Sequence, residues 1–144
     1  NGYSMTPTLN DQERLVVYKW GQIKRFSLIY FKDPKSGQKM VRRVVGLPGE
    51  RLEYKGGSLW INGAEIPERF LSTLGELDEG EPATEDFSLQ ELLGQDAVPE
   101  GSYVVLGDNR RYATDSRDFG VVSEEAIIGV VKARIFPLHQ MNQF

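Results

Sequence analysis

The chain has 144 residues, of which 40% are hydrophobic and 26% are charged, and its formal net charge is −4. This size and composition predict a single globular domain with its own core, and no run of about 18 apolar residues is present to span a bilayer. The absence of cysteine excludes disulfides and thiolate chemistry, and a single histidine, His139, argues against a metal cluster or a histidine-based triad.

Almost all of the predicted elements are strands. A turn-rich segment, 1–10, comes first. Apolar or β-branched runs bounded by turn residues then predict strands at 15–20, 26–31, 39–45, 52–54, 59–62, 103–106 and 126–136. With almost no amphipathic helix, the chain is predicted to be all-β, either a barrel or a coiled antiparallel sheet.

The segments between these strands contain recognisable turns. Residues 33–37 and 55–58 predict hairpin turns, the second through Gly-Gly, and Asn62-Gly63 predicts a further turn. Ser88–Leu93 predicts a short helix or strand, and 107–120 a long polar loop. Within the last strand, Gly129 predicts a bulge or bend.

Charge is distributed unevenly along the chain. Residues 65–100 contain 11 of the 21 acidic residues and one basic residue, Arg69, so the rest of the chain is net positive. A positive body could face an acidic membrane or polymer, but a solvated surface explains the same pattern. We interpret 65–100 as an acidic insertion within one domain that covers 1–144.

Two adjacent arginines interrupt the apolar 39–45 strand. Because a strand alternates its faces, Met40 and Arg42 point one way while Val41 and Arg43 point the other. At least one arginine therefore faces the better-covered side of the sheet. A charged side chain is rarely buried there without a partner or a function.

Three motifs follow one another along the chain: Ser4-Met5-x-Pro7-Thr8-Leu9, then Arg43-Val-Val-Gly-x-Pro-Gly-Glu50, then Gly107-Asp-Asn-Arg110 with Asp115-Ser-Arg117-x-x-Gly120. Taken singly, each is compatible with ordinary turns closed by Ser, Asp and Asn side chains. Together they resemble the type I signal peptidases, membrane-anchored serine proteases that remove signal peptides outside the cytoplasmic membrane. The short Gly-Gly hairpin and modest insertion are more similar to the Gram-positive branch.

This resemblance implies a large, mostly antiparallel coiled β fold and a Ser/Lys catalytic dyad, without a metal or other cofactor. It also implies an N-terminal membrane anchor and a location on the extracytoplasmic face of the membrane. The sequence begins at Asn1 rather than Met, so we expect an anchor or signal to have been removed. The implied partners are extended peptide segments of exported proteins at the membrane surface, and no nucleic acid is implied.

The first motif carries the reacting group of the family. Ser4 matches the nucleophile, and its own N–H would form part of the oxyanion hole, with Gly2 at the neighbouring position. Met5 and Pro7 match residues that shape the floor of the cleft.

The other motifs match residues that bind substrate or support the site. Met40 and Val41 match the strand beside which an extended Ala-x-Ala peptide adds by β-augmentation. In the third motif, Asp115 and Arg117 match a structural ion pair. The matched supporting residues in this loop are Asp108, Asn109, Ala113, Asp115, Ser116 and Arg117.

The chain departs from the family pattern at the position of the general base and at two further places. Arg42 occupies the position of the general-base lysine. That base must be neutral to accept the serine proton, whereas an arginine stays protonated in proteins. Lys39 cannot substitute, because three residues along a strand place it on the opposite face. Ala113 replaces the serine that holds the lysine amine, and Arg25-Phe26-Ser27 stands where the family has Arg-Gly-Asp.

Two functional interpretations remain open. Loss of the lysine and of its helper favours a family member released from catalysis, which binds extended segments of exported proteins as an accessory factor. Some atypical Gram-positive members act in this way in pilus assembly. The alternative is a genuine signal peptidase that cuts after Ala-x-Ala, in which the lysine was replaced by design or Ser4 is activated by another group. A polyanion-binding β domain is disfavoured, because no exposed aromatics are interleaved with a basic cluster.

Overall fold

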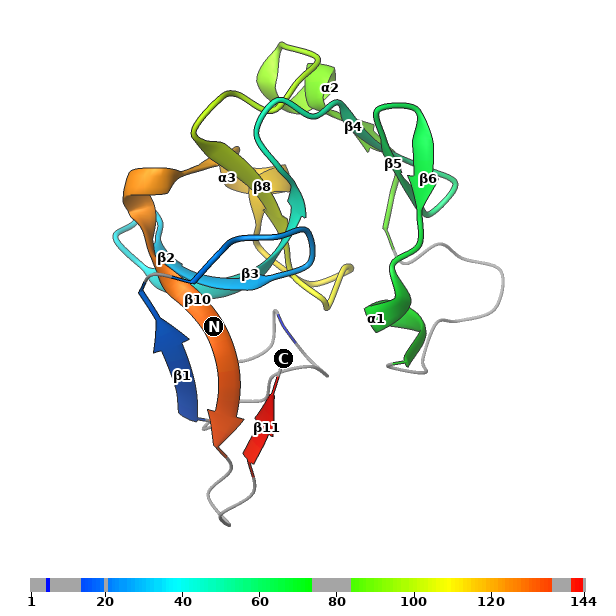
Figure 1. The fold of residues 1–144 in the computed structure, drawn as a ribbon. Coiled ribbons are helices and arrows are strands. Elements are labelled where there is room, and N and C mark those ends of the chain that lie inside the picture. Colours follow the sequence, from blue (N-terminus) through cyan, green and yellow to red (C-terminus); the bar gives the residue numbers. More distant parts are fainter. Residues whose placement is uncertain (1–4, 6–13, 20, 74–83, 136–140, 144) are drawn as a thin grey trace.

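The strands form two antiparallel sheets (Figure 1). The computed structural model describes residues 5, 14–19, 21–73, 84–135 and 141–143. Within these residues neither sheet closes into a barrel, so the coiled-sheet form of the all-β prediction is confirmed. In the same part of the chain, every helix is too short or too polar to cross a bilayer.

The larger sheet contains seven strands, in the order β1-β10-β2-β3-β8-β9, with β11 paired to β10. Their bounds are β1 Arg14–Tyr18, β2 Leu28–Lys32, β3 Lys39–Gly46, β8 Ser102–Leu106, β9 Val122–Ser123, β10 Ile127–Ile135 and β11 Met141–Gln143. The predicted hairpin turn joins β2 to β3, and its Gly37 N–H donates to the Asp33 carbonyl oxygen at 2.8 Å. β3 therefore lies near the middle of the sheet.

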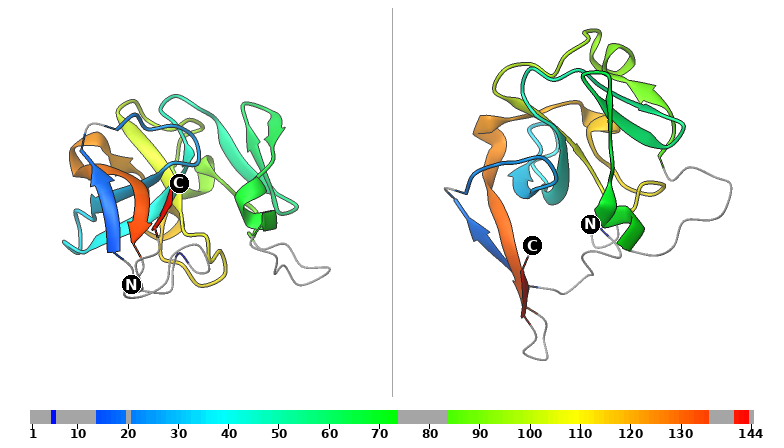
Figure 2. Two further views of the ribbon diagram at one scale, coloured as in Figure 1. Left: turned by 60° about the horizontal axis from the view of Figure 1, so that its bottom comes forward. Right: turned by 45° about the vertical axis from the view of Figure 1, so that its right-hand side comes forward.

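The smaller sheet has the order β6-β5-β4-β7 and stands beside the larger one (Figures 1 and 2). Its strands are β4 Leu52–Lys55, β5 Ser58–Ile61, β6 Ala64–Ile66 and β7 Phe87–Ser88. Both predicted turns adopt positive φ at their two central residues, Gly56-Gly57 and Asn62-Gly63. Asn and Gly tolerate this conformation, which two-residue hairpin turns require.

The helices are short: α1 Arg69–Thr73, α2 Leu89–Leu93, α3 Ser116–Phe119 and the 3-10 turn Glu124–Ala126. Two of them lie in the segment interpreted as an acidic insertion, which also contributes Phe87, Leu89 and Val98 to the core. The prediction that 107–120 is a loop throughout was wrong at α3. A four-residue helix has no hydrophobic period to detect, and it starts here because Asp115 caps it.

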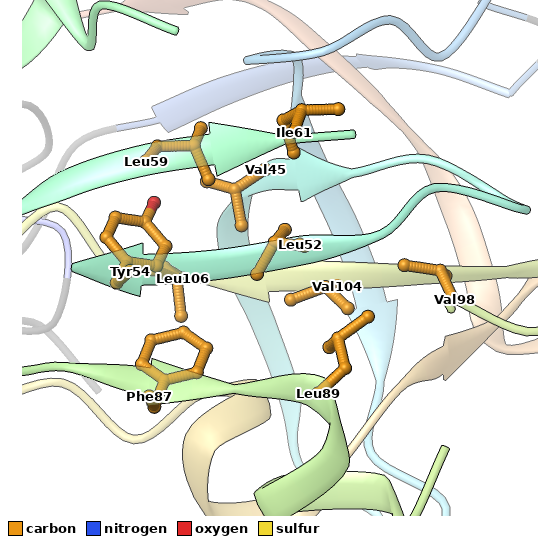
Figure 3. Packing of buried hydrophobic residues seen from close by; sticks show 10 residues of the cluster. All are labelled: Val45, Leu52, Tyr54, Leu59, Ile61, Phe87, Leu89, Val98, Val104 and Leu106. Carbon is orange, nitrogen blue, oxygen red and sulfur yellow. The ribbon is translucent and has the colours of Figure 1, made fainter. Parts of the chain in front are cut away.

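A hydrophobic cluster joins the two sheets (Figure 3). Side chains of the larger sheet point toward those of the smaller sheet and its flanking segments. The ten residues are Val45, Leu52, Tyr54, Leu59, Ile61, Phe87, Leu89, Val98, Val104 and Leu106. A second cluster, which includes Met40 and Val44, covers the other face of β3. Because β3 is covered on both faces, both of its arginines are buried.

Gly129 marks the predicted bend in β10. The pairing of β10 with β2 shifts register between Ile127 and Gly129. A Cβ atom at Gly129 would lie 2.6 Å from Val17 Cγ1 and 2.8 Å from the Tyr18 carbonyl oxygen. Only glycine lets β1 pack this closely against β10.

Candidate functional site

Arg42 is buried at the boundary between β3 and the loop that follows β8. Its side chain is 2% exposed. Nε donates to the Thr114 carbonyl oxygen at 2.8 Å, and Nη1 donates to the Val41 carbonyl oxygen at 2.7 Å. Within the described part of the chain, Arg42 forms no ion pair. The guanidinium is therefore held by main-chain carbonyls rather than by a carboxylate.

The protonation state of Arg42 follows from its environment. Burial lowers the pKa of the guanidinium, and the nearby negative charge of Asp115 raises it. Because an arginine pKa starts far above neutral pH, a lowering of this kind leaves the group charged. Arg42 therefore presents a cation with N–H donors and no lone pair that could accept a proton.

The second arginine of the pair, Arg43, points to the opposite face and has a complete set of partners. Nε and Nη2 bind the Asp108 carboxylate at 2.9 and 2.7 Å, and Nη1 donates to the Phe26 carbonyl oxygen at 2.9 Å. Its guanidinium carbon lies 4.2 Å from the centre of the Phe70 ring. Arg43 thus fixes Asp108, and with it the start of the 107–115 loop, against β3.

Sequence reasoning missed a second buried ion pair, which anchors α1. Arg110 Nη2 lies 2.7 Å from the Glu68 carboxylate, and Arg110 Nη1 donates to the hydroxyls of Thr84 and Tyr54 at 3.1 and 3.3 Å. The Tyr54 hydroxyl in turn donates to Glu68 at 2.8 Å. Glu68 and Arg110 are far apart in sequence, so no local pattern could have paired them.

Asp115 organises the end of the loop. Its carboxylate is fully buried and binds Arg117 Nε and Nη2 at 2.9 and 2.7 Å. It also accepts the Gly107 N–H at 2.9 Å, and it caps α3 together with Asp118. The next residue, Ser116, accepts the Val105 N–H through its hydroxyl at 2.8 Å. These bonds tie both ends of the loop to each other.

β3 has an open edge at its N-terminal half. On one side it pairs with β2 along 39–43, whereas on the other side β8 pairs only with Arg43, Val44 and Gly46. The main-chain bonds of Gln38 with Asp33 and of Val44 with Ser27 point toward the β2 side. Since these directions alternate along an antiparallel strand, the N–H and C=O of Lys39 and Val41 point to the opposite side. No described strand pairs with them there.

The predicted substrate residues occupy different positions relative to this open edge. Val41 presents its main chain to the edge, and its side chain packs against the cluster of Met5, Leu28 and Val131. Met40 is buried in the second core cluster and lies opposite Phe31 of β2. Met5 is buried, and its sulfur accepts the Asp108 N–H at 3.3 Å. The predicted Ser4, Gly2 and Pro7 lie outside the described residues.

The other predicted residues of this loop are Ala113 and Asn109. Ala113 directly precedes Thr114, whose carbonyl oxygen binds Arg42. The Asn109 carbonyl oxygen accepts the Tyr112 N–H at 3.0 Å, which closes the turn at the tip of the loop. The loop thus lies against β3 at the end of the open edge.

The departure at Arg25-Phe26-Ser27 is accommodated without loss of the ion pair beside it. Arg25 binds Glu50 through two bonds of 2.7 and 2.6 Å, and Glu50 also accepts the Leu47 N–H at 2.7 Å. Phe26 adopts a positive φ of 71°, a conformation that favours glycine. Its ring packs against Phe70 with the ring centres 5.0 Å apart.

Comparison with known proteins assigns this arrangement to a family. Residues 1–136 match the family described as signal peptidase, peptidase S26. The chain belongs to this signal peptidase family. Among its relatives is signal peptidase I V of Bacillus subtilis, 42% identical over 90% of this chain and 79% of that protein. Signal peptidase IB of Staphylococcus aureus is 36% identical over 98% of this chain and 78% of that protein.

The fold of this signal peptidase family member also has a solved counterpart. A crystal structure of a signal peptidase I from Enterococcus faecalis is similar with a TM-score of 0.71 at 42% sequence identity. The match covers 76% of this chain and 97% of that chain. The predicted resemblance to type I signal peptidases is therefore confirmed.

Proposed function

We propose that this signal peptidase family member binds extended segments of exported proteins at the open edge of β3 and does not cleave them at a useful rate. The observation that carries the proposal is the buried Arg42, at the position that the family resemblance gives to the general base. A guanidinium held by two carbonyl oxygens donates hydrogen bonds and cannot accept the serine proton.

Binding requires a different part of the molecule from catalysis. An extended peptide adds to a strand edge through main-chain hydrogen bonds, which need neither a base nor a nucleophile. The main-chain groups of Lys39 and Val41 supply that edge in the described part of the chain. In this proposal the protein works at the outer face of the cytoplasmic membrane as an accessory factor. Exported subunits of the kind assembled into pili are the first clients to test.

Cleavage and binding can be measured side by side. With a preprotein in detergent micelles, we expect no more cleavage at Ala-x-Ala than with Ser4→Ala, because loss of a general base costs about 10²–10⁴ in rate. Titration with a labelled signal-peptide segment should shift the amide resonances of residues near 38–42. Cleavage that disappears in Ser4→Ala would overturn the proposal. Shifts confined to the acidic 65–100 segment would place the binding surface elsewhere.

A genuine signal peptidase remains the second candidate, because Ser4 is retained and the supporting loop keeps its ion pairs. In that case the loop supports catalysis as soon as a lysine replaces Arg42. The two candidates differ in how much cleavage activity Arg42→Lys alone restores.

A further inference from the structure

Arg42 is a buried cation that contacts no carboxylate among the described residues, although the charge of Asp115 acts on it from nearby. The other four buried or half-buried guanidinium groups described above each bind a carboxylate: Arg25 with Glu50, Arg43 with Asp108, Arg110 with Glu68, and Arg117 with Asp115. Arg42 has two main-chain carbonyl oxygens and, among the described residues, no ion pair. Buried charges in proteins are normally paired, so an unmatched one indicates a partner that arrives from outside.

The guanidinium lies at the edge where a peptide would add. Nη1 is 2.7 Å from the Val41 carbonyl oxygen, and that carbonyl points to the side of β3 that no described strand covers. A carbonyl oxygen has two lone pairs, so Val41 can hold Arg42 and still accept an N–H from an added strand. A peptide paired with Val41 must therefore run directly beside Arg42.

The open edge ends at Arg42. From Arg43 onward the same edge of β3 is already paired, with Arg43 opposite Leu106 and Val44 opposite Val105. The bond from Arg42 to Thr114 also joins β3 to the loop at this point. An added strand cannot continue past this boundary without displacing β8, so the position suits the end of a chain better than its middle.

These contacts also place the guanidinium close to the main chain of β3. Both of its partners, at Val41 and Thr114, are main-chain oxygens, so the guanidinium is at the height of the backbone rather than of the side chains. A C-terminal carboxylate is a main-chain group, and the planar fork of an arginine fits a carboxylate through two parallel hydrogen bonds.

From these observations we infer that Arg42 is a carboxylate-binding residue, and that the open edge of β3 selects peptides that end in a free C-terminal carboxylate. This inference rests on the proposed peptide binding and adds the class of ligand. The ligand class is an extended peptide with a small C-terminal residue and a free acid. Such a peptide is the product, and not the substrate, of cleavage after Ala-x-Ala.

The test compares two forms of one peptide. A fluorescein-labelled seven-residue segment ending in Ala-Gln-Ala is prepared as the free acid and as the C-terminal amide, and the dissociation constant of each is measured by fluorescence anisotropy. We expect the acid to bind about tenfold more tightly than the amide, because one charge-assisted hydrogen bond contributes about that much to affinity. Equal affinities would overturn the inference and leave peptide binding intact. If neither form bound, the proposed function would fail as well.

A third peptide separates the two sources of a carboxylate. An amide ending in Ala-Glu-Ala carries the same charge on a side chain, and we expect it to bind no better than the Ala-Gln-Ala amide. If it matched the free acid, the assignment to a chain terminus would be overturned.

Variants assign the effect to Arg42. Arg42→Gln should abolish the difference between acid and amide, while Arg42→Lys should keep part of it through the remaining charge. Lys32→Gln is the matched control: Lys32 is an exposed cation on the neighbouring strand β2, opposite Lys39, and lies outside the open edge of β3. A preference that survives Arg42→Gln in folded protein, or disappears in Lys32→Gln, would overturn the assignment. The comparison of peptides on the unaltered chain does not depend on any variant folding.

Discussion

Nε of Arg42 lies 2.8 Å from the carbonyl oxygen of Thr114, so β3 is bound directly to the loop through the residue that follows Ala113. A lysine at position 42 would reach the same region with an amine, and a serine at 113 could orient that amine. Positions 42 and 113 are therefore the two at which the proposed loss of catalysis can be tested.

The first prediction concerns this restoration. If the chain is a family member released from catalysis, Arg42→Lys should recover cleavage weakly. Arg42→Lys/Ala113→Ser should recover more than the two single variants combined, because adjacent groups in one network do not act additively. Preprotein cleavage by all three variants is the measurement. If the parent was an active peptidase with Ala113, Arg42→Lys alone will restore full cleavage, and the accessory-factor proposal fails.

The second prediction concerns the buried Asp115. Asp115→Ala removes the partner of Arg117, the acceptor for Gly107 and the cap of α3 together. We expect the free energy of unfolding to fall by about 3–5 kcal/mol, the range for breaking a buried pair. Urea denaturation measures it. Glu125→Ala removes an exposed carboxylate and should stay within about 0.5 kcal/mol of the parent. Equal effects of the two variants would contradict the structural role.

The third prediction uses the positive φ of Phe26. At this position Phe26→Gly should be more stable than Phe26→Ala by about 1 kcal/mol, because both lose the ring contact and only alanine keeps the backbone strain. The control is Lys32, an exposed residue within β2. There the order should reverse, with Lys32→Ala the more stable by about 0.5–1 kcal/mol. The same order at both positions would show that Phe26 is not strained.

The fourth prediction is a dependence on pH. Burial raises the pKa of the Tyr54 hydroxyl well above its usual value; the positive charge of Arg110 opposes this shift and Glu68 adds to it. The unfolded chain releases this proton near pH 10, while the folded protein keeps it to a higher pH. The contribution of Tyr54 to the free energy of unfolding is therefore complete below about pH 10. It is lost as the pH rises above this value, by up to about 1.4 kcal/mol per pH unit.

Tyr54→Phe should flatten the fall in stability above pH 10, although it removes the hydrogen bond to Glu68. Urea denaturation between pH 9 and 11 measures the slope, and absorbance at 295 nm follows tyrosinate formation. Tyr112→Phe is the control: it removes the hydroxyl of a residue that is 77% exposed. An unchanged slope in Tyr54→Phe would contradict the raised pKa.

The sequence predicted the local elements of the fold well, because they depend on neighbouring residues. The β2–β3 and β4–β5 hairpins follow from short turns between apolar runs, and the bend at Gly129 follows from a glycine within a strand. Alternation along β3 indicated that at least one of Arg42 and Arg43 would be buried. Both are buried, since this strand is covered by the smaller sheet on one face and by a second core cluster on the other.

The candidate site was less accessible to sequence reasoning, because its contacts join distant segments. Arg43 binds Asp108 across 65 positions, and Arg42 binds Thr114 across 72. Family resemblance pointed to Asp108 as a supporting residue without naming its partner. Nothing in the local pattern around Glu68 indicated that it would bind Arg110, because an acidic residue in an acidic segment looks solvated until the chain is folded.

The register of β1 constrains the order in which this protein can fold during synthesis. Among the described strands β1 pairs with β10 alone, with Arg14 opposite Ile135, and the contact between Met5 and Asp108 spans 103 positions. Closing such long loops costs conformational entropy that local contacts do not offset. The early hairpins are therefore expected to form first, and β1 to pair only after β10 has been synthesised. While the chain emerges from a ribosome, the β2–β3 hairpin can form before Asp108 and Thr114 are synthesised, so its two arginines and Met5 gain their partners only later, from the same loop.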